Sequence, residues 1–201
     1  MDIAVGDKLG VALRRAVKWV AMLNLGYFGI EFAVALAIGS VSLFADSIDF
    51  LEDASINLLI LVALGWSARN MARVGMALAA ILLVPGLATL WTAWDKLNAP
   101  VAPDPLPLSL AGLGALGVNL SCALILVRFR RHGSSLTRAA FLSARNDAFA
   151  NVAIVAAGLV TAFLWQSAWP DLLVGLAIAL MNADAAREVW ETARRERSAA
   201  A

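Results

Sequence analysis

The chain has 201 residues, of which 61% are hydrophobic and only 15% charged, with a formal net charge of +1. Soluble domains carry roughly a quarter charged residues, so this composition excludes an ordinary soluble fold and indicates an integral membrane protein. The near-neutral charge, without a basic stripe, argues against nucleic-acid binding. The single cysteine, Cys122, excludes a disulfide framework within the chain.

Apolar segments of about 20 residues, long enough to cross a bilayer, recur along the sequence. They predict an all-α membrane protein with six transmembrane helices, near 17–38, 40–64, 74–95, 108–127, 139–164 and 170–187. The N-terminus lacks the pattern of a removable signal peptide, and the tail from Arg187 is too short to form a core of its own. We expect residues 1–201 to form a single transmembrane domain without a soluble C-terminal domain.

Basic residues gather on one side of the predicted bundle. They lie near the start of the first helix, in the second and fourth connections and in the tail, whereas Lys96 alone lies on the other side. The positive-inside rule therefore places both termini in the cytoplasm, and we expect the protein in a bacterial inner (cytoplasmic) membrane. All seven tryptophans fall at predicted helix ends, where indole rings prefer to lie. Four prolines, Pro100, Pro103, Pro105 and Pro107, predict a non-helical third connection, and Pro85 predicts a kink in the third helix.

The first helix carries polar residues on one face: Asn24, Tyr27 and Glu31. Glu31 is an acid inside the membrane, and two readings stay open for it. It can hydrogen-bond to another helix, or it can take part in a metal or proton path.

The second helix carries four carboxylates, Asp46, Asp49, Glu52 and Asp53. The spacing puts Asp46, Asp49 and Asp53 on one face, with Asn57 further along it, whereas Glu52 points away and suits a structural or subunit contact. Asp49 and Asp53 lie near the membrane midplane, where each charge costs roughly 2.5–3.5 kcal/mol. Two acids one turn apart repel each other unless a cation or proton lies between them, so the pattern favours a cation site over acids that only hold helices together. Asp46 lies nearer the helix end and is either part of this site or structural.

The fifth helix presents a second polar face, formed by Ser143, Asp147 and Asn151. The short repeat Asp-Ala-x-x-Asn occurs at Asp53 and again at Asp147, which is weak support for an internal repeat. Arg145 lies near the cytoplasmic end, where it either extends to the interface, which is the favoured reading, or pairs with an intramembrane acid. His132, the only histidine, lies in the cytoplasmic connection and is expected to be a solvated loop residue. With no HExxH helix and no histidine in the membrane, the sequence argues against an intramembrane enzyme.

Three stretches together carry a resemblance: "NLGYFGIE" in the first helix, "GSVSLFADSIDFLEDASIN" in the second and "SARNDAFAN" in the fifth. With the "WPDLLVGLAIA" opening of the last helix, they resemble the cation diffusion facilitator family of divalent metal/proton antiporters over nearly the whole chain. The resemblance implies a tetrahedral transport site at Asp49, Asp53, Ser143 and Asp147. Asp46, Asn146, Asn151, Asn24 and Glu31 are further candidates for the metal shell or the proton path.

Two features depart from the family pattern. Members commonly carry histidine at the position of Ser143, and a hydroxyl is a poorer ligand for zinc than imidazole. Most members also carry a cytoplasmic metal-sensing domain that supports dimerisation, so this chain looks like a short form.

The resemblance implies a divalent metal transporter rather than an enzyme. Zn²⁺ efflux by proton antiport is favoured because the family most often moves zinc, whereas the oxygen ligands also suit Mn²⁺, Co²⁺, Fe²⁺ or Cd²⁺. The metal is expected as substrate, with no separate cofactor, and the partners are protons, membrane lipid and a second copy of the chain. Dimer contacts are expected along Gly112, Ala115 and Asn119, or at the apolar end of the second helix. A non-transporting partner subunit and a passive channel are the alternatives.

Overall fold

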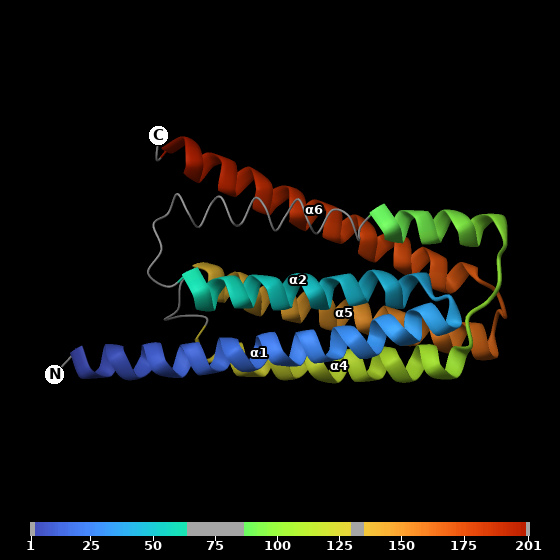
Figure 1. The fold of residues 1–201 in the computed structure, drawn as a ribbon. Coiled ribbons are helices and arrows are strands. Elements are labelled where there is room, and N and C mark those ends of the chain that lie inside the picture. Colours follow the sequence, from blue (N-terminus) through green and yellow to red (C-terminus); the bar gives the residue numbers. More distant parts are fainter. Residues whose placement is uncertain (1–2, 64–86, 130–134, 200–201) are drawn as a thin grey trace.

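The computed structural model describes residues 3–63, 87–129 and 135–199, and these residues form helices and turns without a strand. In chain order the helices are α1 (Ile3–Ile38), α2 (Val41–Ala63), a helix over 87–98, α4 (Pro105–Val127), α5 (Ser135–Phe163) and α6 (Trp169–Ala199). Both termini lie at the same end of the helical assembly (Figure 1). The prediction of an all-α fold with six helices is confirmed in the part of the chain that the structure describes, whereas Pro85 and His132 lie outside it.

Two helices are longer than the sequence pattern predicts. α1 begins at Ile3 rather than near 17, because residues 3–16 contain no proline that would end a helix. α6 continues to Ala199, well beyond the predicted end near 187. Its last part is rich in alanine, glutamate and arginine, which are good helix formers, and Arg187 pairs with Glu191 at 2.9 Å, one turn along.

The third connection is shorter than predicted. Only 99–104 is non-helical, and Pro105 and Pro107 belong to the first turns of α4. The side chain of Asp104 caps this helix by accepting a hydrogen bond from the Leu106 amide at 3.1 Å. Proline suits the first turn because it has no N–H that would need a helical partner there.

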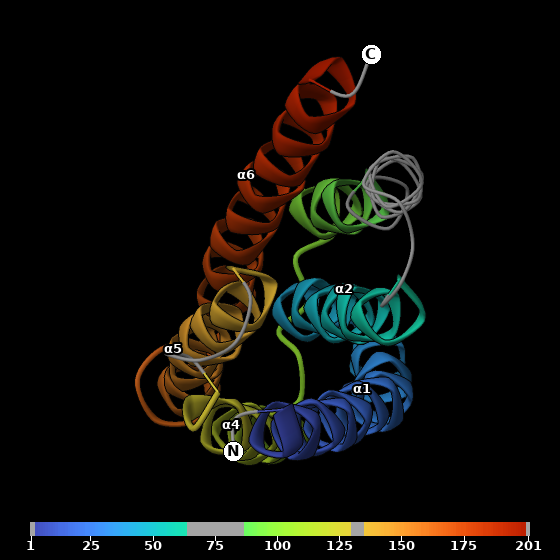
Figure 2. The ribbon, with the colours of Figure 1, turned by 90° about the vertical axis from the view of Figure 1, so that its left-hand side faces the viewer.

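The helices pack in pairs around a common interior. α1 packs along α2 and α4, α4 along α5, and α2 also contacts α5 and α6. Seen end-on, α1, α2, α4 and α5 form one bundle, and α6 and the 87–98 helix lie beyond α2 and α5 (Figure 2). A buried cluster joins five of these helices through Ala35, Leu43, Leu108, Ile154 and Ile178.

The small-residue stripe on α4 faces this interior. Gly112, Ala115 and Asn119 are all buried, and a Cβ placed on Gly112 would lie 3.0 Å from Cγ2 of Ile154 on α5. Since α5 covers the stripe, the expectation that it forms a dimer surface is wrong.

The outer surface suits a membrane. Three helical stretches are long and apolar enough to cross one, Gly10–Ile38, Pro105–Val127 and Ser143–Phe163. α2 differs from them because it holds four carboxylates between 46 and 53. Among the tryptophans whose side chains the structure describes, Trp19, Trp91, Trp94, Trp165 and Trp169 are all exposed, as the predicted interfacial positions require.

Candidate metal site

The carboxylates of α2 meet the polar face of α5 inside the bundle. The Ser143 hydroxyl donates to Oδ1 of Asp53 at 3.0 Å and lies 3.4 Å from Oδ2 of Asp147, so it bridges the two helices. Asp53 is buried, whereas Ser143 and Asp147 are partly exposed. These three residues are the centre of the candidate site, and they come from the two stretches that the spacing singled out.

Asp49 lies one turn before Asp53 on α2 and is also partly exposed. The hydrogen bond from Ser143 to Asp53 brings this part of α2 against α5. Within the described ranges, however, no three His, Cys, Asp or Glu side chains are arranged closely enough to hold a metal ion as they stand, so metal binding requires them to draw together.

Asp46 and Asn151 belong to a separate buried chain of hydrogen bonds. The Asn151 amide donates to Oδ2 of Asp46, and its Oδ1 accepts from the Asn119 amide at 3.0 Å. This chain links α2, α5 and α4. Asn151 is therefore turned towards Asp46 and Asn119, while Ser143 is the α5 residue that contacts Asp53.

Asn146 lies on the exposed side of α5. Its Oδ1 accepts a hydrogen bond from Arg145 at 3.2 Å, and both residues are exposed. The structure therefore does not bring Asn146 to Asp53, although Asn146 directly precedes Asp147 in the sequence. Arg145 is exposed, and its extension to the membrane interface stays a prediction.

Two polar residues of α1 are fully buried beside this region. Neither carboxyl oxygen of Glu31 receives a hydrogen bond from a described residue. Asn24 lies 3.7 Å from the sulfur of Cys122 through its Oδ1. Glu31 on α1 and Asp46 on α2 are thus both fully buried acids on helices that pack against each other.

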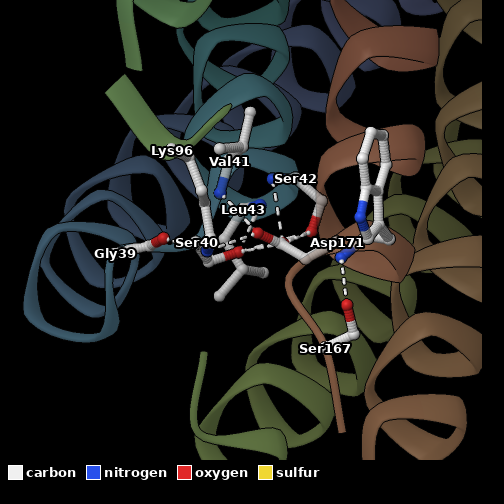
Figure 3. A network of polar contacts seen from close by, with 9 residues as sticks. Gly39, Ser40, Val41, Ser42, Leu43, Lys96, Ser167 and Asp171 are labelled. Carbon is white, nitrogen blue, oxygen red and sulfur yellow. Dashed lines mark hydrogen bonds and ion pairs between the residues drawn. The ribbon is translucent and has the colours of Figure 1, made fainter. Parts of the chain in front are cut away.

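A further network was not predicted from the sequence (Figure 3). It joins the starts of α2 and α6, which lie at the end of the bundle away from the termini (Figure 1). Asp171, in the first turn of α6, accepts hydrogen bonds from both the amide and the hydroxyl of Ser42, from the Ser40 hydroxyl and from the Val41 amide, at 2.6–3.1 Å. Lys96, at the end of the 87–98 helix, forms a buried ion pair with it at 2.9 Å. We call these five residues the Asp171 network.

The sequence contained a signal for this network. Lys96 is the single basic residue on its predicted side of the membrane, and Asp171 directly follows the Trp-Pro start of the last helix. A single cation on that side and an acid at the start of a helix there are candidates for pairing. Because Lys96 is buried in this pair, it is not a surface charge opposing the positive-inside assignment.

Comparison with known proteins identifies the family. The model of the cation efflux transmembrane domain matches residues 17–195, which include most of α1 and α6, all of the other described helices and the whole candidate site. No curated protein matches the chain significantly. Members of this family are transporters of divalent cations rather than enzymes. The chain is therefore an integral membrane protein that belongs to the cation efflux, or cation diffusion facilitator, family of divalent cation transporters.

Proposed function

We propose that this protein exports a divalent transition-metal ion in exchange for protons, with Zn²⁺ as the first candidate. The observation that carries the proposal is the Ser143 hydroxyl, which bridges Asp53 on α2 and Asp147 on α5 at 3.0 and 3.4 Å. It joins carboxylates from two helices at membrane depth, where unpaired charge is costly. A cation held between them would offset both that cost and the repulsion between the acids.

In this proposal Asp49, Asp53 and Asp147 bind the ion, and the Ser143 hydroxyl or a water completes the shell. Asn146 has no part in it, since it is exposed and paired with Arg145. Asn151 acts indirectly by holding Asp46. The metal is transported substrate, so no separate cofactor is assigned.

The ligand set also supports a second candidate substrate. All four proposed ligands offer oxygen, which suits harder cations such as Mn²⁺ better than an imidazole-containing set would. Zinc is favoured by the family resemblance and manganese by the Ser143 hydroxyl. Cobalt, iron and cadmium ions complete the set that a three-carboxylate site can hold.

Proton coupling follows from competition for the same oxygens. A carboxylate must lose its proton to bind a metal ion, so protons that enter from one side can displace the ion from the site. We place Asp46 and Glu31 in the proton path, because both are fully buried acids on helices that pack against each other, α2 and α1. Alternating access then requires the helices to open the site to each side in turn.

The proposal is tested with the purified chain in proteoliposomes. Uptake is measured for Zn²⁺, Mn²⁺, Co²⁺, Cd²⁺ and Fe²⁺ in competition, with and without an imposed pH gradient. Accumulation against the metal gradient, driven by the pH gradient, is expected for an antiporter. Flux that only dissipates the metal gradient would indicate a passive channel, and no metal-dependent proton flux would indicate a non-transporting partner subunit.

A further inference from the structure

The Asp171 network caps α2 with a side chain from another helix. The Ser40 hydroxyl, at the N-cap of α2, accepts from the Leu43 amide at 3.1 Å, in the usual manner of a capping serine. The first two amides of the helix, of Val41 and Ser42, donate instead to Asp171 of α6 at 2.9 and 3.1 Å. The start of the acid-bearing helix is therefore held by α6 (Figure 3).

Charge makes this connection hard to open. Asp171 is fully buried and Lys96 nearly so, and Lys96 also donates to the Gly39 carbonyl just before α2. Removing one partner of a buried ion pair leaves an uncompensated charge in a low-dielectric interior, which is strongly unfavourable. Separation of α2 from α6 at this end would also break the hydrogen bonds that two helix-terminal N–H groups donate to Asp171.

Packing closes the same contact. A Cβ on Gly175, one turn after Asp171, would lie 2.7 Å from the Val41 carbonyl carbon and 2.8 Å from the Ser42 nitrogen. The backbones of α2 and α6 thus touch here, and Val41, Ala93 and Leu172 pack together beside them. Towards the termini α6 diverges from α2 in both views (Figures 1 and 2).

We propose that the Asp171 network is a fixed joint that keeps the start of α2 against the start of α6 throughout the transport cycle. The two helices then separate only at the end that carries the termini. Asp171 is accordingly a positioning residue: it sets where Asp46, Asp49 and Asp53 lie without touching the ion. The inference rests on the proposed function, because it assigns the joint a part in that cycle.

The first test locks the joint covalently. Val41→Cys and Leu172→Cys are introduced together in a Cys122→Ser background, which removes the native thiol, and are linked with a short, reducible bifunctional thiol reagent. The linked protein is expected to transport at the rate of the two single-cysteine controls treated alike. Loss of transport that a reductant restores would show that the joint must open, and would overturn the proposal.

The second test changes the ion pair and measures metal affinity by calorimetry, beside melting temperature and transport. Asp171→Asn is expected to weaken metal binding by roughly tenfold, because it leaves the Lys96 ammonium without its carboxylate. Tenfold is the lower end of the loss seen when a residue that orients metal ligands is removed. Lys96→Gln should have a smaller effect, since Asp171 keeps its four donors from α2. The double variant should lie closer to the parent than Asp171→Asn alone.

These readouts separate a failed joint from a failed transporter. If folded Asp171→Asn binds metal as tightly as the parent, Asp171 does not position the site and the proposal is overturned. If the parent binds metal without transporting it, the proposed function fails. The joint is then supported if the covalent link leaves the metal affinity unchanged, and overturned if the link changes that affinity. If the parent binds no metal, melting temperature decides: the double variant must melt above Asp171→Asn, and the reverse order overturns the joint.

Discussion

Each carboxylate at the α2–α5 contact supplies a negative charge that the proposed metal site needs. We predict that Asp49→Ala, Asp53→Ala and Asp147→Ala each lower transport by at least roughly 100-fold. Losing a residue that only supports a metal ligand already costs up to about 100-fold, and these residues are the proposed ligands themselves. Membrane insertion should remain intact, because each change removes a buried charge that is costly in the membrane. Proteoliposome uptake, normalised to inserted protein, measures the effect.

Asp184→Ala is the matched control for this series, since it removes an exposed carboxylate from α6. It should transport like the parent. Parent-level flux in any of the three site variants would remove that residue from the ligand set.

Ser143 sets the chemical character of the site because its hydroxyl stands between two carboxylates. We predict that Ser143→His shifts preference from Mn²⁺ towards Zn²⁺, since imidazole is the better ligand for zinc. The competitive uptake ratio of the two metals measures this shift. Ser55→His on α2 is a suitable control, because the Ser55 hydroxyl bonds only to the Leu51 carbonyl of its own helix among the described contacts. An unchanged ratio in Ser143→His would mean that this side chain does not face the ion.

Between the helices, amide side chains hold the acids in place. Asn151→Ala is predicted to destabilise the protein by about 1–3 kcal/mol, because it leaves a buried carboxylate oxygen of Asp46 without a donor. Asn119→Ala should cost less, near the average of about 0.6 kcal/mol for hydrogen bonds between membrane helices, since both groups are neutral. Unfolding in mixed detergent measures both changes. Asn98→Ala, at an exposed amide bonded to its own helix, should leave stability nearly unchanged. Equal losses of stability in all three variants would contradict the chain of hydrogen bonds through Asn151.

The contact between α2 and α6 makes its own prediction. Gly175→Ala would place a methyl group 2.7 Å from the Val41 carbonyl carbon, so α6 must shift away from α2. We expect lower thermal stability and weaker metal binding. Gly117→Ala is the control, because a Cβ there meets nothing within 4 Å and alanine favours a helix over glycine by about 1 kcal/mol. A Gly175→Ala protein as stable as the Gly117→Ala protein would contradict the close packing.

The sequence predicted elements more completely than contacts between them. Helical spacing placed Asp49 with Asp53, and Ser143 with Asp147, on shared faces, and the structure brings these two faces together through Ser143. Spacing gives a face but not the rotation of one helix against another. For that reason it could not tell that Asn151 turns to Asp46.

The same limit explains what was missed at the ends of the helices. Asp171 lies at the start of both α6 and α2, which favours a negative charge through the N–H groups of two helices. That convergence depends on packing between segments far apart in the chain. The prediction of a dimer surface at the small-residue stripe of α4 was wrong for a related reason. Close packing of small residues suits a contact between helices of one bundle as well as a dimer contact.

At the scale of the whole molecule, the remaining candidate dimer surface is the apolar end of α2, where Leu58 and Val62 are exposed. Apolar exposure alone does not drive helices together in lipid, so association here depends on close packing. We predict that the protein forms a homodimer in nanodiscs and that this dimer dissociates on dilution. Mass photometry measures the dimer fraction. In a Cys122→Ser background, Leu58→Cys should crosslink between copies, whereas Leu124→Cys, on the exposed face of α4, should not. Equal crosslinking at both sites would indicate random collision. A protein that stays monomeric at every concentration and still transports would show that each copy completes the cycle alone.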